Sequence, residues 1–124
     1  MDSRMKSPGP EHPISVEPTD HRVVVRLGRR VVADTTAALT LHEASYPPVY
    51  YVPRTDIDET QLTASSTHTY CPYKGEADYH GLTGPDGEIT DAVWTYPTPY
   101  DAVAEIAGYL AFYPDKVRID TDGA

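Results

Sequence analysis

The sequence predicts a small, mainly β, single-domain protein: a curved antiparallel sheet, a sandwich or a partly closed barrel, with one short helix. From position 21 onward most apolar residues fall in short stretches that alternate with polar residues or are bounded by Pro and Gly, as in β-strands. Only residues 99–108 place apolar side chains at helical spacing. A chain of 124 residues can bury one modest core. About eight short strands and one helix do not fit alternating β–α units.

The sequence predicts a proline-rich tail, residues 1–20, followed by a β domain, residues 21–124. The first segment holds four of the 12 prolines and few apolar side chains, so it is not expected to build a regular hydrogen-bonded ladder. We expect at least residues 1–8 to be mobile.

The strands are predicted by period-two alternation and by turn residues. Residues 23–33 read as a hairpin with a tight turn at Gly28, and the strand at 49–52 ends at Pro53. Residues 56–62 could form one helical turn. Further strands are predicted at 39–43, 76–82, 92–96, 110–113 and 116–120, with a turn at 84–87.

The helix at residues 99–108 has recognisable start signals. Thr98 can cap it, Pro99 suits the first helical position, and Asp101 supplies a carboxylate three residues after the cap. Its apolar face should lie on the sheet.

Charge excludes some partners. Nineteen Asp and Glu against ten Lys and Arg give a formal net charge of -9, most of it in residues 56–124. Such a surface repels phosphate backbones and anionic lipid, so we expect neither a nucleic-acid nor a membrane partner. Arg22, Arg26, Arg29 and Arg30 surround the first hairpin, where they form either an anion patch or a solvated strand face.

The sequence has no run of about 18 apolar residues that would span a membrane. Its first residues also lack the apolar segment of a secretory signal, so we expect a cytoplasmic protein. The single cysteine, Cys71, excludes an intramolecular disulfide.

Several segments, in order along nearly the whole chain, resemble the bacterial family known as domain of unknown function 427. These segments are 9–14, 32–35, 41–56, 71–79, 92–97 and 106–114, and the stretch Cys-Pro-Tyr-Lys-Gly at 71–75 is the most specific. The resemblance implies a small, mainly β fold and no settled substrate. It also implies that part of the tail, near residues 12–14, packs against the body.

Members of that family have been labelled nucleotidyltransferase-like, but the motifs here do not support that label. The chain lacks the Gly-Ser loop and paired acids that hold a triphosphate and Mg²⁺, and Asp56-x-Asp58 alone is weak. It also lacks a Gly-rich phosphate loop, a Gly-x-Ser-x-Gly elbow and a His-Glu-x-x-His helix. We therefore expect no cofactor.

Strand periodicity places a carboxylate on a core face. In the predicted strand 39–43, Glu43 points to the same side as Leu39 and Leu41. A buried carboxylate must be paired, hydrogen-bonded or protonated, so Glu43 should meet a donor such as Arg54, Lys74 or a tyrosine hydroxyl. Two interpretations stay open, a structural ion pair and a catalytic acid or base.

The turn at residues 71–75 presents two nucleophile types between Pro72 and Gly75. Lys74 lies in an acidic region and suits the binding of a carboxylate or phosphate better than Schiff-base chemistry. Cys71 is either a thiolate beside a cation or a small buried hydrophobe. A metal site of His68, Cys71, His80 and Glu43 is an alternative, but structural zinc sites favour several thiolates, and no metal is expected.

Ten of the 12 aromatic residues are tyrosines, which suit either a cleft that holds an organic ligand or the half-wet faces of a thin β fold. The sequence predicts small-molecule binding, of an anionic or carbonyl compound, with Glu43 and Lys74 as catalytic candidates for general acid–base chemistry. The alternative is a non-enzymatic interaction module, such as a homodimer joined through tyrosine-rich strand edges. The predicted ligand-binding residues are Tyr51, Arg54, Cys71, Tyr73, Tyr79, Trp94 and Tyr96.

Overall fold

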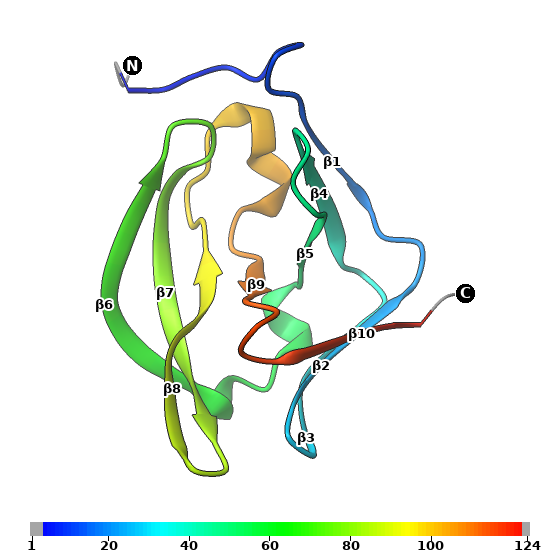
Figure 1. Ribbon diagram of the computed structural model, residues 1–124, viewed down its shortest axis with the longest axis vertical. Coiled ribbons are helices and arrows are strands. Elements are labelled where there is room, and N and C mark those ends of the chain that lie inside the picture. Colours follow the sequence, from blue (N-terminus) through cyan, green and yellow to red (C-terminus); the bar gives the residue numbers. More distant parts are fainter. Residues whose placement is uncertain (1–3, 123–124) are drawn as a thin grey trace.

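The computed structural model describes residues 4–122, which form ten β-strands and three short 3₁₀ helices (Figure 1). The strands build three antiparallel sheets. One sheet has the order β1-β4-β5 (Ile14–Pro18, Leu39–Glu43, Val49–Tyr51), and a second has the order β10-β2-β3 (Arg118–Asp122, Arg22–Leu27, Arg30–Thr35). The third has the order β6-β7-β8-β9 (Leu62–Cys71, Gly75–Gly84, Gly87–Thr95, Leu110–Phe112).

Short bridges join the sheets without closing residues 4–122 into a barrel. Val52, just after β5, pairs with Leu110 of β9 through two backbone hydrogen bonds of 2.8 and 2.9 Å. Ala33 of β3 forms an isolated antiparallel bridge with Ile57, which follows η1 (Arg54–Asp56), and the Asp58 amide donates to the Val32 carbonyl at 2.8 Å. In Figure 1 the long strands β6, β7 and β8 form one side of the molecule, and the two smaller sheets face them.

The space between the sheets is filled by two apolar clusters. The first joins β2 and β3 to the four-stranded sheet, with Val25, Leu82 and Val93 buried at its centre. The second joins β4 and β5 to the end of the four-stranded sheet, and Val103 and Ile106 of η3 pack into it. Tyrosines appear in the second cluster and not in the first.

The predicted fold class is confirmed: the protein is a small antiparallel β domain with little helix. The hairpin turn at Gly28 has the left-handed backbone that glycine favours, with φ of 62°. The helix is shorter than predicted and of the 3₁₀ type, covering Asp101–Ile106, and Tyr100 rather than Thr98 precedes it. Its backbone kinks at Val103, which tucks that side chain into the core. None of the helical segments in residues 4–122 is long and apolar enough to cross a bilayer.

Two strands were missed by the sequence interpretation. β1 lies within the predicted tail, where Pro13 and Pro18 are tolerated because β1 pairs only with β4, at the edge of its sheet. β6 is rich in Ser and Thr and has no apolar alternation, but its pairing with β7 extends from Leu62 to Cys71. In both cases long-range pairing overrides a weak local pattern.

The predicted mobility of residues 1–8 falls partly on residues 1–3, which lie outside the described residues. The described part of the segment lies against the turn between β6 and β7. The Lys6 amide donates to the Pro72 carbonyl at 2.8 Å, and the Arg4 guanidinium lies 3.9 Å from the centre of the Tyr70 ring.

Candidate ligand-binding cavity

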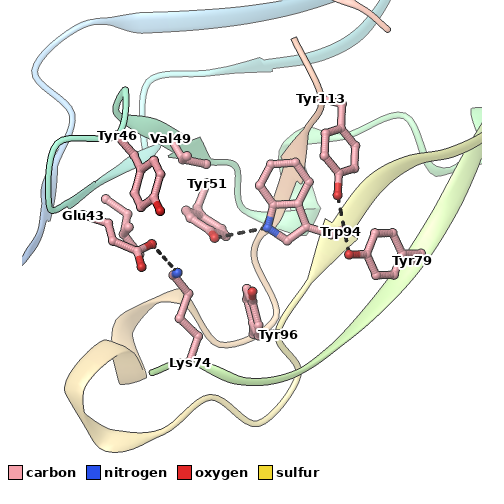
Figure 2. A pocket seen from close by; sticks show the side chains of 10 residues that line it. Glu43, Tyr46, Val49, Tyr51, Lys74, Tyr79, Trp94, Tyr96 and Tyr113 are labelled. Atoms are coloured by element: carbon pink, nitrogen blue, oxygen red, sulfur yellow. Dashed lines mark hydrogen bonds and ion pairs between the residues drawn. The ribbon is translucent and has the colours of Figure 1, made fainter. Parts of the chain in front are cut away.

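A cavity of about 250 Å³ lies beside the second apolar cluster, between β4–β5 and the four-stranded sheet. Its walls carry two opposite charges, five tyrosines and the only tryptophan of the chain (Figure 2). The lining residues are Leu41, Glu43, Tyr46, Val49, Tyr51, Lys74, Tyr79, Trp94, Tyr96 and Tyr113. Tyr46 stands at the rim, with 65% of its surface exposed.

Strand register places these side chains on shared faces. Leu41 of β4 pairs directly with Val49 of β5, so both side chains reach the same wall. Tyr79 of β7 pairs directly with Trp94 of β8 on the opposite wall. The two walls therefore come from different sheets, and the cavity exists only when the sheets are packed together.

Glu43 and Lys74 form an ion pair in the wall. The Lys74 ammonium donates to Glu43 Oε1 at 2.5 Å, and the side chains are only 17% (Glu43) and 10% (Lys74) exposed. Gly75, with φ of 106°, ends the turn that carries Lys74, a conformation that favours glycine. Two backbone hydrogen bonds hold Lys74. Its amide donates to the Cys71 carbonyl at 3.2 Å, and its carbonyl accepts from the Tyr100 amide at 3.0 Å.

The second oxygen of Glu43 is bound by a residue from the N-terminal segment. His12 Nε2 lies 2.7 Å from Glu43 Oε2, and the His12 ring stacks on Tyr73, with centroids 4.1 Å apart and planes 5° apart. Burial raises the pKa of the Glu43 carboxyl, but the hydrogen bonds and charges of Lys74 and His12 outweigh burial and lower this pKa below its ordinary value. Glu43 is therefore charged at neutral pH.

Three tyrosines of the cavity are kept protonated by burial. Burial is the main cause that raises the pKa of Tyr51, of Tyr96 and of Tyr113, the last to about 12. Trp94 Nε1 donates to the Tyr51 hydroxyl at 3.2 Å, which leaves the Tyr51 O–H free to donate elsewhere. Within the described residues the Tyr46 and Tyr96 hydroxyls make no hydrogen bond, and in Figure 2 both point toward the cavity.

The other end of the cavity is closed by a hydroxyl pair. Tyr113 donates to the Tyr79 hydroxyl at 3.5 Å, and Tyr79 also shares a hydrogen bond of 2.9 Å with Thr69. The Tyr113 ring lies against Trp94, with centroids 4.5 Å apart. The two ring planes are tilted by 48° to each other, so this end of the cavity offers aromatic rings and paired hydroxyls.

The structure brings most of the predicted site residues together. Glu43, Lys74, Tyr51, Tyr79, Trp94 and Tyr96 all line the cavity. Arg54 does not: it lies in η1, is about half exposed, and pairs with Glu59 at 2.6 Å. The prediction that Arg54 contributes to this cleft is therefore wrong, because Pro53 ends the strand that carries Tyr51 and the chain turns away.

Cys71 and Tyr73 lie next to the cavity rather than in its wall. Cys71 Sγ is 3.8 Å from Lys74 Nζ and packs against the second apolar cluster, as a small hydrophobe would. Tyr73 acts through the His12 ring that it stacks on. Cys71 thus contacts Lys74, and Tyr73 contacts His12, while neither residue lines the cavity.

Sequence reasoning missed His12, Tyr46 and Tyr113. His12 sat in the segment interpreted as a tail, although its position between two prolines was a signal of fixed backbone. Tyr113 ends the predicted strand 110–113, and its partners could not be identified without knowing how the sheets pack.

Metal ligands do not gather in the described part of the chain. No group of three or more His, Cys, Asp or Glu side chains in residues 4–122 could hold an ion. His68 is 65% exposed and pairs with Asp78 at 2.8 Å, on the strand next to its own.

Comparison with known families identifies the class of this β domain. A family model described as "Domain of unknown function (DUF427)" matches residues 15–123. The chain belongs to this family, and every residue of the cavity wall lies within the matched range. Among curated proteins, none matches the chain.

Proposed function

We propose that the cavity binds a small, uncharged organic molecule that carries at least one carbonyl oxygen. The observation that carries this proposal is an excess of donors. Among residues 4–122, the O–H groups of Tyr46, Tyr51 and Tyr96 have no acceptor, and Lys74 has a third N–H beyond those aimed at Glu43 and Cys71. Glu43 is the only carboxylate in the cavity wall, and both of its oxygens already accept hydrogen bonds. A ligand rich in acceptors satisfies such a wall.

Charge balance favours a neutral ligand over an anion. Lys74 and Glu43 neutralise each other in a wall where both are largely buried. An anionic ligand would add a charge that no free cation in the wall offsets, and an uncompensated buried charge is costly. The sequence-based expectation of an anionic or carbonyl group is therefore narrowed to the carbonyl alternative.

Size and wall chemistry limit the ligand further. The volume of about 250 Å³ is below the roughly 300–1,000 Å³ typical of sites for drug-sized ligands. Trp94 and the Tyr113 ring offer aromatic faces against which a planar group can pack. A single planar ring with one or two carbonyl oxygens fits these limits.

General acid–base catalysis is a second candidate, favoured by the Glu43–Lys74 contact in the cavity wall. Glu43 would carry the proton, and Lys74 would stabilise negative charge that develops on the carbonyl oxygen. Because the pKa of Glu43 is lowered, its carboxylate is a weak base until Lys74 shifts toward the ligand. Glu43→Gln should then lower turnover by roughly 10²- to 10⁴-fold.

Trp94 makes the binding proposal directly testable, since it is the only tryptophan and lies in the wall. Titration with benzamide and with benzoate, which share a ring and differ in charge, should change Trp94 fluorescence at lower concentration for the neutral amide. Tyr96→Phe removes one donor and should weaken benzamide binding by about 2- to 10-fold, the value of one hydrogen bond.

Tyr50→Phe is the matched control, because Tyr50 precedes Tyr51 on β5 but contacts His21 outside the cavity. The proposal fails if neither compound changes the fluorescence. It also fails if benzoate binds as tightly as benzamide, or if Tyr96→Phe behaves as Tyr50→Phe does.

A further inference from the structure

The candidate cavity shares part of its wall with a second hollow. Tyr79 and Tyr113 line both the cavity and an outer hollow of about 330 Å³. The remaining lining residues of the outer hollow come from β6, from β8 and from the turn after β9. Figure 2 shows the two tyrosine hydroxyls pointing toward each other at this end of the cavity. A ligand that extends past these hydroxyls would therefore enter the outer hollow.

The contact between the two tyrosines is weak. Tyr113 donates to the Tyr79 hydroxyl at 3.5 Å, whereas hydrogen bonds between two hydroxyls are typically about 2.7–2.8 Å long. Tyr79 also shares a hydrogen bond of 2.9 Å with Thr69, which does not involve Tyr113. A ligand hydroxyl can therefore replace the Tyr113 hydroxyl with little loss of hydrogen bonding.

Asp91 holds the β6 side of the outer hollow in place. Its carboxylate accepts from the Ser65 hydroxyl at 2.5 Å through one oxygen and from the Thr67 hydroxyl at 2.6 Å through the other. A hydroxyl has one proton to donate, and that of Thr67 is directed at Asp91. The Thr67 oxygen therefore faces a ligand in the outer hollow as an acceptor.

The turn after β9 adds an unpaired acceptor and two spare donors. Within residues 4–122 the Asp115 carboxylate makes no hydrogen bond or ion pair. Lys116 Nζ donates to the Thr90 carbonyl at 3.0 Å and keeps two further N–H groups. A hydroxyl group can donate to Asp115 and accept from Lys116, whereas a single charged group would be attracted by one of them and repelled by the other. The outer hollow thus suits hydroxyl groups.

We propose that the ligand has two parts: a planar ring with a carbonyl group in the cavity, and a substituent with at least two hydroxyl groups, as in a sugar or a glycerol ether, in the outer hollow. This inference rests on the proposed function and deepens it, because it names the class of ligand. Asp115 accepts from the hydroxyls of the substituent, Lys116 donates to them, and the Tyr113 hydroxyl moves aside. The ligand stays uncharged, as the neutral Glu43–Lys74 pair in the cavity wall favours.

Three benzamides test the two parts of the ligand separately, with Trp94 fluorescence of the full chain as the readout. Benzamide occupies the cavity alone, 4-propoxybenzamide adds a chain without hydroxyls, and 4-(2,3-dihydroxypropoxy)benzamide adds the same chain with two hydroxyls. We expect the dihydroxy compound to bind about 5- to 50-fold more tightly than the propoxy compound, the value of two ordinary hydrogen bonds. It should also bind more tightly than benzamide.

Asp115→Ala removes the unpaired acceptor and should reduce the advantage of the dihydroxy compound over the propoxy compound by about 2- to 10-fold. Asp86→Ala is the matched control, because Asp86 is also an exposed aspartate in a turn, between β7 and β8, and lines neither hollow. It should leave all three affinities unchanged. Both aspartates are exposed, so both variants should unfold at the same urea concentration as the wild type.

Equal affinities for the propoxy and dihydroxy compounds would overturn the inference, and so would a dihydroxy compound that binds more weakly than benzamide. An effect of Asp115→Ala no larger than that of Asp86→Ala would also overturn it. In each of these cases benzamide still binds, so the proposed function stands. If none of the three compounds changes Trp94 fluorescence, the proposed function and the inference fail together.

Discussion

Removing Lys74 should reveal how far the charged pair holds the cavity together. Lys74→Met keeps an unbranched apolar stem and removes the ammonium group, with its charge and its hydrogen-bond donors. Glu43 would keep His12 as a partner but lose the contact at 2.5 Å while remaining 17% exposed. The perturbation therefore leaves a mostly buried carboxylate with half of its hydrogen-bonding partners.

The expected loss of unfolding free energy follows from the burial of the Glu43–Lys74 pair. Breaking a buried ion pair by removing one partner costs roughly 3–5 kcal/mol. Because the pair is partly exposed and His12 remains, we expect about 3 kcal/mol, the lower end of that range. For a urea slope of about 1.5 kcal/mol per molar, the unfolding midpoint falls by about 2 M.

A double variant measures the interaction energy between Glu43 and Lys74. Glu43→Gln with Lys74→Met leaves no unpaired charge, so it should cost less than the sum of the two single changes, by about 2 kcal/mol. Glu59→Gln removes the partner of Arg54 in an exposed ion pair, and it should cost no more than about 1 kcal/mol. This exposed pair is the control for charge removal in general.

The lowered pKa of Glu43 also fixes how the stability of the protein depends on pH. The pKa of Glu43 is lowered in the folded protein from an ordinary value of 4.5, so its stabilising effect is fully present above pH 4.5. It is lost as the pH falls through the folded pKa. The difference in unfolding free energy between wild type and Lys74→Met should be constant near neutral pH and shrink below 4.5. Additive single changes, or a difference that grows in acid, would refute this reasoning.

Three further results are expected. Tyr51→Phe leaves Trp94 Nε1–H without its partner and should cost about 1–2 kcal/mol in urea unfolding, with a shifted Trp94 emission; an unchanged spectrum would contradict the contact. In an alkaline absorbance titration Tyr113 should ionise near pH 12, and Tyr51 and Tyr96 only beyond it or on unfolding; ten tyrosines titrating together at ordinary pKa values would contradict this burial. Leu110→Ala should cost about 2–5 kcal/mol, because Leu110 is fully buried where two sheets meet; a loss below about 1 kcal/mol would show loose packing there.

Local patterns in the sequence predicted most of the fold. Alternation and glycine turns identified the β2–β3 hairpin, and Pro53 marked the end of β5. β6 could not be predicted, because its Ser and Thr residues carry no apolar period, and its pairing with β7 decides its conformation. The helix type was also beyond reach, since the kink at Val103 serves tertiary packing.

The candidate site was also predicted only in part from local sequence patterns. Parity along β4 was enough to place Glu43 on a core face and to require a donor for it. Choosing among Arg54, Lys74 and tyrosine was not possible, because a difference of 31 positions between Glu43 and Lys74 is bridged only by the packing of two sheets. His12 was missed for the same reason, since its contact with Glu43 also spans 31 positions.

Under the proposed function, the Glu43–Lys74 ion pair would link ligand preference to the packing of the sheets. Glu43 belongs to the β1-β4-β5 sheet, and Lys74 belongs to the turn that joins β6 and β7. A ligand carboxylate that drew Lys74 away would break this link, at a cost near the 3 kcal/mol expected for Lys74→Met, which corresponds to roughly 10²-fold in affinity. A carbonyl oxygen that accepts the third N–H of Lys74 leaves the link intact. Under the proposed function, the Glu43–Lys74 contact would therefore select against anions, and the comparison of benzamide with benzoate tests this ion pair as well as the ligand.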